Sequence, residues 1–364
     1  MYYLLCSDLL SALGYGQILP LLNLSLLQRG LNLSTVATGA SLLLLACFAF
    51  SLPAGVFADQ LGCKPALVIG ALLQTASAWG QVNTTTTWGL YAANLAGGLA
   101  LALFSGAKVP MLTRLAPEAE LGAAIARSRA IGGLGSVAGA AMAAAFCWQN
   151  GELRQILWVG ALITSLSIIP LLWLPNRQAA SRTPVHRHRI QRTAGPLPRQ
   201  LGVLFLASIG YSLLTPFINL LLSRRGFPPA AISASFSVWQ LLPLLAYPSV
   251  IRLSRMRRQP LPLALLSLAT ITLCLAGLLP KALWWGLWLC WQAALTIVQC
   301  LMHSSLAAST RRATSFAGLS MLQTLAAVIG TQVGGLLLPS QPWLYLVSAG
   351  CCLSACVLLA AVRR

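Results

Sequence analysis

Acidic side chains are scarce in this sequence, so their positions indicate where proton or ion chemistry could take place. Five occur in 364 residues, and they are Asp8, Asp59, Glu118, Glu120 and Glu152. Only Asp8 falls inside a long apolar segment, where a carboxylate is typical of a proton-coupling or cation-binding site. A second interpretation stays open, because Asp8 lies only about two helical turns from the start of that segment and can reach water.

The other reactive side chains predict no catalytic or metal centre. Most of the ten cysteines lie inside apolar runs, and the sequence has no CxxC pair and no Cys/His cluster. This usage is typical of small buried hydrophobic residues rather than disulfides or metal ligands. The apolar segments also lack a Ser/His/Asp set. We therefore expect no enzyme activity, no metal and no cofactor.

The composition indicates a protein whose surface faces lipid. Hydrophobic residues make up 57% of the chain and charged residues 8%, with a formal net charge of +19. A soluble domain carries about 25% charged residues. The basic residues lie in short gaps between apolar runs instead of forming one face, so we expect membrane lipids and not nucleic acid as the partner of this charge.

Apolar segments long enough to span a membrane occur twelve times, which predicts an all-α integral membrane protein with twelve transmembrane helices. The predicted spans are 2–24, 33–57, 65–82, 87–110, 122–147, 153–174, 201–222, 230–250, 261–280, 283–303, 314–338 and 342–362. A segment rich in Arg and Pro, 176–199, has no apolar periodicity and is expected to be a linker. It separates an N-terminal six-helix bundle, 1–175, from a C-terminal one, 200–364.

Basic residues predict the orientation of these spans. Most of the 24 Lys and Arg residues fall on the side that holds both termini and the central linker. Since short cytoplasmic loops carry an excess of Lys and Arg, we expect both termini to be cytoplasmic. The short loops favour a multi-pass protein of the bacterial inner membrane.

The first span of each half contains a repeated pattern. "GYGQILPLLNLSLLQRG" (Gly14 to Gly30) aligns with "GYSLLTPFINLLLSRRG" (Gly210 to Gly226) at an offset of 196 residues, and Pro20 and Asn23 are among the matches. Two halves of the same orientation, joined by a polar linker, indicate parallel repeats with a binding site between them.

The stretch "GVFADQLGCKPAL", 55–67, follows the second predicted span and resembles the loop between helices two and three of the major facilitator superfamily. The matching residues include Gly55, Asp59, Gly62 and Lys64. The resemblance implies two six-helix bundles related by a pseudo-twofold axis along the membrane normal, and transport by alternating access.

Within this resemblance, Asp59 would act as a gating residue. An anion at the end of a helix of the opposite half is stabilised by the helix dipole. Such a contact would hold the cytoplasmic ends of the two halves together while the binding site faces outward. By topology, Lys108 and Arg114 are the nearest candidate partners of Asp59.

Two further segments bear on ion coupling and on packing. Asn94 occupies a position where many relatives have an arginine associated with proton coupling, so its presence weakens the prediction of a standard proton relay. The glycines of helices five and eleven predict close helix packing, and they are Gly132, Gly135, Gly139, Gly330 and Gly334. The helix-five segment also resembles the antiporter pattern, with Ala140 in place of proline, which favours export.

Neutral polar residues inside the spans are the candidates for a substrate cavity. They are Tyr15, Gln17, Asn23, Asn94, Tyr211, Asn219, Trp239, Gln240, Gln292, Gln299 and Gln323. A cavity lined by such residues suits an uncharged or zwitterionic solute. For each residue taken singly, a hydrogen bond between helices is the alternative.

Together these features predict a monomeric secondary active transporter. It would export a small organic solute, such as a metabolite, siderophore, drug or sugar-like compound, with protons as the second partner. The alternative is an uncoupled facilitator or importer of a neutral polar solute, and Asn94 makes this alternative more credible. A non-transporting receptor on the same fold also stays open, because fold alone does not decide function.

Overall fold

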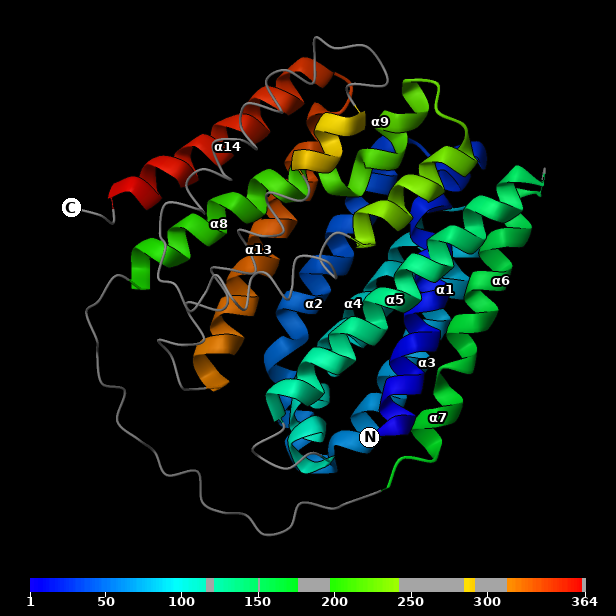
Figure 1. The fold of residues 1–364 in the computed structure, drawn as a ribbon, viewed down its shortest axis with the longest axis vertical. Helices are drawn as coiled ribbons and strands as arrows, with labels where there is room; N and C mark the ends of the chain where they lie inside the picture. Colours follow the sequence, from blue (N-terminus) through cyan, green and yellow to red (C-terminus); the bar gives the residue numbers. More distant parts are fainter. Residues whose placement is uncertain (116–120, 150, 176–196, 242–284, 292–312, 362–364) are drawn as a thin grey trace.

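The described chain of this computed structural model is helical throughout its regular structure (Figure 1). The structure describes residues 1–115, 121–149, 151–175, 197–241, 285–291 and 313–361. Within these residues, seven helices are long and apolar enough to cross a membrane. The fold is therefore that of an all-α membrane protein.

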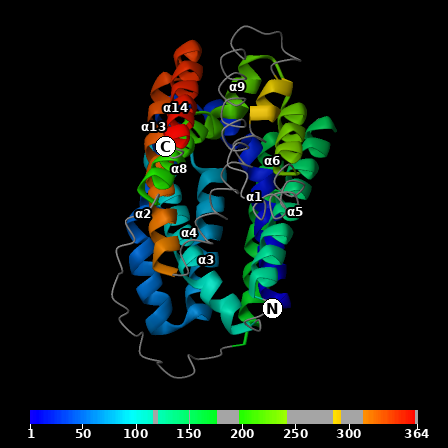
Figure 2. The same ribbon diagram turned by 60° about the vertical axis from the view of Figure 1, so that its left-hand side comes forward.

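Seven helices form the N-terminal part of the chain. They are α1 (Tyr2–Gln28), α2 (Leu33–Leu61), α3 (Cys63–Asn83), α4 (Thr87–Leu115), α5 (Leu121–Trp148), α6 (Leu153–Leu166) and α7 (Ile168–Leu172). They pack in two layers, with α2, α3 and α4 on one side and α1, α5 and α6 on the other (Figure 2). Each of the first six predicted spans coincides with one of these helices, the sixth being divided between α6 and α7.

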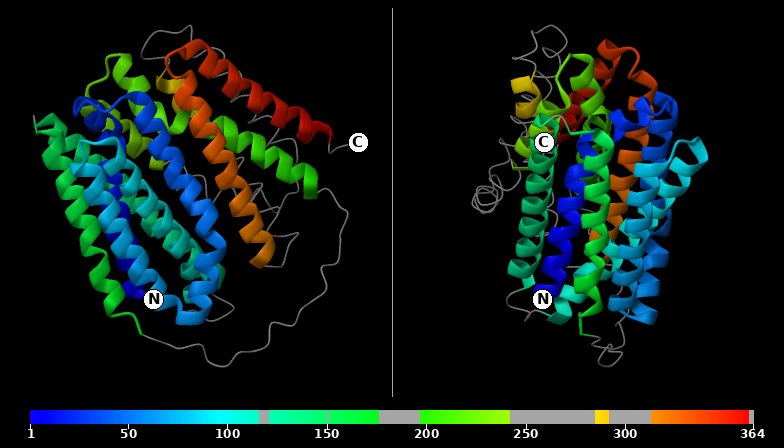
Figure 3. Two further views of the ribbon diagram at one scale, coloured as in Figure 1. Left: turned by 180° about the vertical axis from the view of Figure 1, so that it is seen from behind. Right: turned by 90° about the vertical axis from the view of Figure 1, so that its right-hand side faces the viewer.

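In the C-terminal part, the described elements are α8 (Leu197–Leu214), a 3-10 turn (Thr215–Phe217), α9 (Ile218–Arg224), α13 (Ala313–Leu337) and α14 (Gln341–Ala361). Residues 229–241 and 285–291 are also helical. They represent only parts of the predicted spans 230–250 and 283–303, and the predicted span 261–280 lies outside the described residues. Figure 3 shows α13 beside α2, while α8 and α14 pack on α13 and on each other.

The turns between helices divide the molecule into two ends. We call the end with Met1, the α2–α3 turn and the end of α7 the Met1 face. The opposite end, with the α1–α2, α3–α4, α5–α6 and α13–α14 turns, is the Arg29 face. Large aromatic side chains are exposed at both faces, as expected at a membrane interface: Tyr2 and Trp173 at the Met1 face, and Trp88, Trp148 and Trp343 at the Arg29 face.

Glycine makes the tight turns possible. The α2–α3 turn consists of Gly62 alone, with φ of 98°, a backbone conformation that residues with a Cβ rarely adopt. Gly30 and Gly226, which are matched in the sequence repeat, have φ of 87° and 76° and follow α1 and α9 respectively. The repeat therefore extends from sequence to backbone geometry.

Polar residues of α3 face the interior of the N-terminal helices. Gln74 donates to Ser11 of α1 at 2.8 Å, and Gln81 donates to Asn94 of α4 at 3.0 Å. These pairs explain why α3 is less apolar than its neighbours: its glutamine amide nitrogens bond to other helices and are not exposed to lipid.

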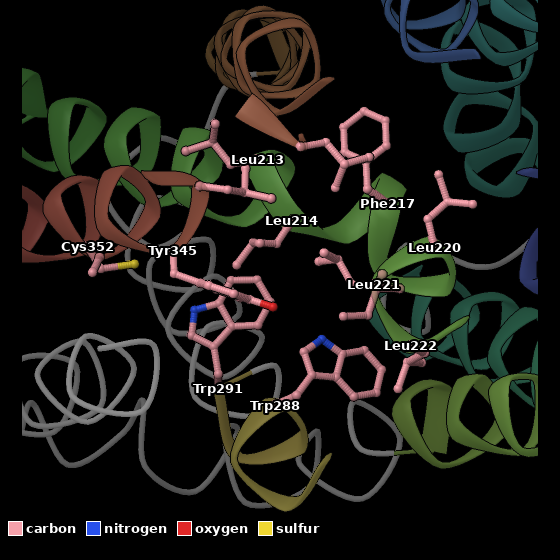
Figure 4. Packing of buried hydrophobic residues seen from close by; sticks show 14 of the residues in the cluster. Leu213, Leu214, Phe217, Leu220, Leu221, Leu222, Trp288, Trp291, Tyr345 and Cys352 are labelled. Atoms are coloured by element: carbon pink, nitrogen blue, oxygen red, sulfur yellow. The ribbon is translucent and has the colours of Figure 1, made fainter. Parts of the chain in front are cut away.

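The C-terminal core is rich in aromatic residues. Figure 4 shows the indoles of Trp288 and Trp291 directed toward Tyr345 of α14 and Leu221 of α9. The same cluster includes Ala37 of α2 and Ala140 of α5, so it extends across the contact between the N-terminal and C-terminal helices.

Candidate functional site

An ion pair links α1 and α4 near the Met1 face. Lys108 Nζ lies 2.8 Å from Asp8 Oδ1, and the side chains are 31% and 11% exposed respectively. Ser128 of α5 donates a hydrogen bond of 2.7 Å to the other oxygen, Oδ2, of Asp8. The carboxylate therefore connects three helices through one ion pair and one hydroxyl.

Close packing of α1 on α5 brings Ser128 within reach of Asp8. A Cβ added at Gly135 would lie 2.7 Å from the carbonyl oxygen of Leu9, and one at Gly139 would lie even closer to that of Leu13. Two helices can approach this closely only where one of them lacks side chains. The Gly135 and Gly139 predicted to pack helices thus lie beside the predicted coupling residue.

The equivalent contact occurs in the C-terminal helices, where Gly330 and Gly334 of α13 lie against the backbone of Ile209 and Leu213 in α8. Gly132 differs from the other four predicted packing glycines, because a Cβ there would meet no described atom within 4 Å. Gly132 is therefore the one member of the set without a close neighbour in the described chain.

The segment predicted to be a gating loop lies at the Met1 face, but it is not a loop: Asp59 is in the last turn of α2 and Lys64 in the first turn of α3. Asp59 is exposed, and it makes no hydrogen bond or ion pair with the residues that the structure describes. Lys64 donates 2.8 Å to the carbonyl oxygen of Leu172, at the end of α7, where a cation is favoured by the helix dipole. Gly55 lies against Gly106, which brings α2 close to α4.

Lys108 forms an ion pair with a different carboxylate from the one that the helix order suggested. Lys108 pairs with Asp8 and not with Asp59. The side chain of Arg114, the other candidate partner of Asp59, lies outside the described side chains. Both acidic residues lie at the same end of the molecule, so topology did not distinguish between them.

Three candidate cavity residues, Tyr15, Gln17 and Asn94, lie on helices of the N-terminal part. Tyr15 of α1 is half-buried. Gln17 is fully buried, and its amide nitrogen lies 3.7 Å from the sulfur of Met142 on α5. Asn94 is 6% exposed, accepts from Gln81 and donates to the carbonyl of Leu90 at 2.9 Å. These contacts connect helices within one half.

Aromatic contacts dominate the candidates of the C-terminal helices. Tyr211 stacks on Trp291 with ring centroids 6.2 Å apart, and Trp239 makes edge contacts with Phe236 at 5.2 Å and Trp288 at 6.3 Å. Gln240 and Gln323 are half-buried. Gln292 and Gln299 lie outside the described residues.

Asn23 and Asn219 face each other across the two halves near the Arg29 face. The Nδ2 of Asn23 lies 2.6 Å from the carbonyl oxygen of Pro216 and 3.3 Å from Oδ1 of Asn219. The Nδ2 of Asn219 lies 3.2 Å from the carbonyl oxygen of Pro20. These two candidate cavity residues therefore form hydrogen bonds between the halves.

Sequence reasoning missed the structural role of Arg29. Its guanidinium donates to the carbonyls of Gln81 and Thr84 at the end of α3, both at 3.4 Å, and to the hydroxyl of Ser25 at 2.7 Å. Burial, together with the positive charge of Arg154, lowers the pKa of Arg29. The sequence contained a signal for a structural role of Arg29, because this residue is matched by an arginine in the sequence repeat.

Comparison with known sequences identifies relatives over most of the chain. The model of the Major Facilitator Superfamily matches residues 4–331. A multidrug resistance protein MdtH from Yersinia enterocolitica is 26% identical over 370 residues, which cover 95% of this chain and 90% of the relative. An MdtH from Proteus mirabilis is 25% identical over 256 residues, covering 68% of this chain and 62% of the relative.

Solved structures of the same fold cover the whole chain. The nucleoside transporter NupG superposes with a TM-score of 0.76 at 14% identity, covering 100% of this chain and 98% of NupG. The xylose transporter XylE from E. coli has a TM-score of 0.73 at 15% identity, covering 99% of this chain and 97% of XylE. At these identities the comparison establishes the fold alone.

Proposed function

This chain belongs to the major facilitator superfamily and is a secondary transporter, and on that premise we propose that it exports a small organic solute in exchange for protons. The expected solutes are drugs, metabolites, siderophores or sugar-like compounds. Transport proceeds by alternating access of an N-terminal bundle, 1–175, and a C-terminal bundle, 200–364, joined by the linker 176–199.

The Asp8–Lys108 ion pair is the observation that carries the proton-coupling part of the proposal. A carboxylate and an ammonium in a span are costly, and such residues commonly mark ion pathways. A proton on Asp8 removes the negative charge that holds Lys108, so loading a proton loosens the contact between α1 and α4. Ser128 can then donate to or accept from the protonated acid.

Export is the direction favoured by the relatives. The MdtH proteins that match this chain are named for multidrug resistance, a property of exporters. The contact of Asn23 with Asn219 near the Arg29 face, and the unpaired Asp59 in the described chain at the Met1 face, support a state open toward the Met1 face. With both termini cytoplasmic in the inner membrane of a bacterium, this is the state that collects solute from the cytoplasm.

Uncoupled or inward transport is the second candidate. Asn94 supports it, because this residue is engaged by Gln81 and Leu90 and supplies no charge for a proton relay. The neutral character of the candidate cavity residues is equally compatible with both functions and suits an uncharged or zwitterionic solute.

Transport assays in everted vesicles test the proposal. Vesicles containing the full-length chain are supplied with a panel of labelled or fluorescent compounds, with and without an imposed pH gradient. A proton-coupled exporter accumulates at least one compound inside everted vesicles, and dissipation of the gradient stops accumulation. Equal equilibration with and without the gradient would support the uncoupled facilitator instead.

A further inference from the structure

Asn23 and Asn219 form a reciprocal contact between equivalent positions of the two halves. Each donates its side-chain amide to the carbonyl of the proline three residues before its counterpart: Asn23 to Pro216 at 2.6 Å, and Asn219 to Pro20 at 3.2 Å. The offset of 196 residues that aligns the sequence repeat relates both asparagines and both prolines. This is the pattern expected of self-complementary contacts across a twofold axis.

A break in the first helix of the C-terminal half makes the Pro216 carbonyl available. The 3-10 turn Thr215–Phe217 separates α8 from α9. In a continuous helix, the amide of Leu220 would donate to the carbonyl of Pro216. Here that amide instead donates to Oδ1 of Asn219 at 2.9 Å. The side-chain oxygen of Asn219 thus accepts from the Leu220 amide that the break leaves free. The side-chain amide of Asn23 donates to the Pro216 carbonyl that the break leaves free.

The amide groups of this contact are buried, so breaking their hydrogen bonds costs free energy. Asn219 is 1% exposed and Asn23 is half-buried. The nitrogen of the Asn219 amide donates to the Pro20 carbonyl, and its oxygen accepts from the amide of Leu220. Because an unsatisfied buried amide is unfavourable, separation of the halves requires a new partner for each group.

We propose that Asn23 and Asn219 are the positioning residues that hold the Arg29 face closed and thereby set the balance between the two open states of the transporter. When this face opens, the Leu220 amide pairs with the Pro216 carbonyl, and α8 and α9 become one continuous helix. The inference rests on alternating access, but not on the identity of the solute, the direction of transport or proton coupling.

The test is hydrogen exchange of the full-length protein in lipid nanodiscs, without substrate or gradient. Asn23→Leu and Asn219→Leu remove the amide at nearly constant side-chain size. Loss of one such hydrogen bond changes a population about fivefold. We expect exchange to rise by about this factor in segments 28–36 and 222–232 at the Arg29 face, and to fall in segment 59–68 at the Met1 face.

The opposite change at the two faces separates a gating role from simple loss of stability, which would raise exchange at both. Asn83→Leu is the matched control, because Asn83 also lies at the Arg29 face but bonds to Trp79 and Trp158 within one half. Unchanged exchange in Asn23→Leu, a rise at both faces, or the same response in Asn83→Leu would each overturn the proposal. Because Asn219 is the more buried residue, Asn23→Leu keeps the test decisive if Asn219→Leu does not fold.

This readout is independent of the transport assay. If no compound is transported but exchange shifts in opposite directions at the two faces, the proposed export fails and the role of Asn23 and Asn219 stands. If transport is observed but exchange does not shift, the role of Asn23 and Asn219 fails and the proposed export stands.

Discussion

Lys108 Nζ lies 2.8 Å from Asp8 Oδ1, which joins the beginning of α1 to the end of α4. Asp8 is one of only five acidic residues, and Lys108 falls inside the predicted span 87–110. An apolar pair would pack two lipid-embedded helices at lower desolvation cost. We therefore expect the two charges to serve transport rather than helix packing.

Asp8→Asn should abolish accumulation driven by a pH gradient while leaving binding and downhill exchange of substrate largely intact. The amide cannot take up and release a proton in the working pH range, yet its oxygen can still accept from Lys108 and Ser128. The measurement is uptake into everted vesicles at several imposed gradients. Glu152→Gln is the control, because Glu152 is exposed at the Arg29 face. Retained concentrating transport in Asp8→Asn would exclude Asp8 as the coupling residue.

Lys108→Gln should lower the stability of the folded protein by about 1–2 kcal/mol. It leaves Asp8 with Ser128 as its remaining described partner, and the cost stays below that of a fully buried pair because Lys108 is 31% exposed. The apparent Tm of the purified protein reports the loss. We expect the double variant Asp8→Asn/Lys108→Gln to recover part of it.

Lys64→Gln is the matched control for Lys108→Gln. Lys64 lies at the same face but donates only to the carbonyl of Leu172 among the described residues. Its loss removes one partly exposed hydrogen bond and leaves no carboxylate without its ion-pair partner. A fall in Tm equal to that of Lys108→Gln would show that the Asp8–Lys108 pair has no special contribution.

Asp59→Asn should strongly reduce transport without lowering Tm. Asp59 is exposed and makes no polar contact with described residues in this state, so the folded protein loses nothing. We expect the carboxylate to act only when the Met1 face closes, where it would meet a helix end of the other half. Transport and Tm are measured in parallel with Gln60→Ala, a change at the neighbouring exposed position. Full activity of Asp59→Asn would leave Asp59 as a solvated residue in the last turn of α2.

Topology reporters test the proposed orientation. Fusions at Arg364 and near Arg189 should both report a cytoplasmic location, since basic residues gather on that side. A reporter inserted at the exposed Gly30 should report the opposite side. A periplasmic signal at either cytoplasmic site would reverse the assignment of the Met1 face.

The sequence was sufficient for the fold because each spanning helix must satisfy its own backbone and therefore needs a long apolar segment. The repeat likewise predicted that Asn23 and Asn219 are equivalent. It did not predict that they touch, because the contact depends on which face of the transporter is closed. The partner of Asp8 was missed for a related reason. Helix order placed Lys108 at the same end as both Asp8 and Asp59, but rotation and crossing of α1 and α4 decide the pairing.

Gly139→Ala should destabilise the N-terminal helices by about 1–3 kcal/mol, the usual cost of overpacking. The added methyl would collide with the backbone carbonyl of Leu13, which cannot move without shifting α1 on α5. Because Ser128 of α5 reaches Asp8 across this contact, gradient-driven transport should also fall. Gly132→Ala, on the same helix but with no described atom within 4 Å of the new methyl, should leave Tm and transport unchanged or raise Tm slightly. Equal Tm values for the two variants would contradict the close packing of α1 on α5.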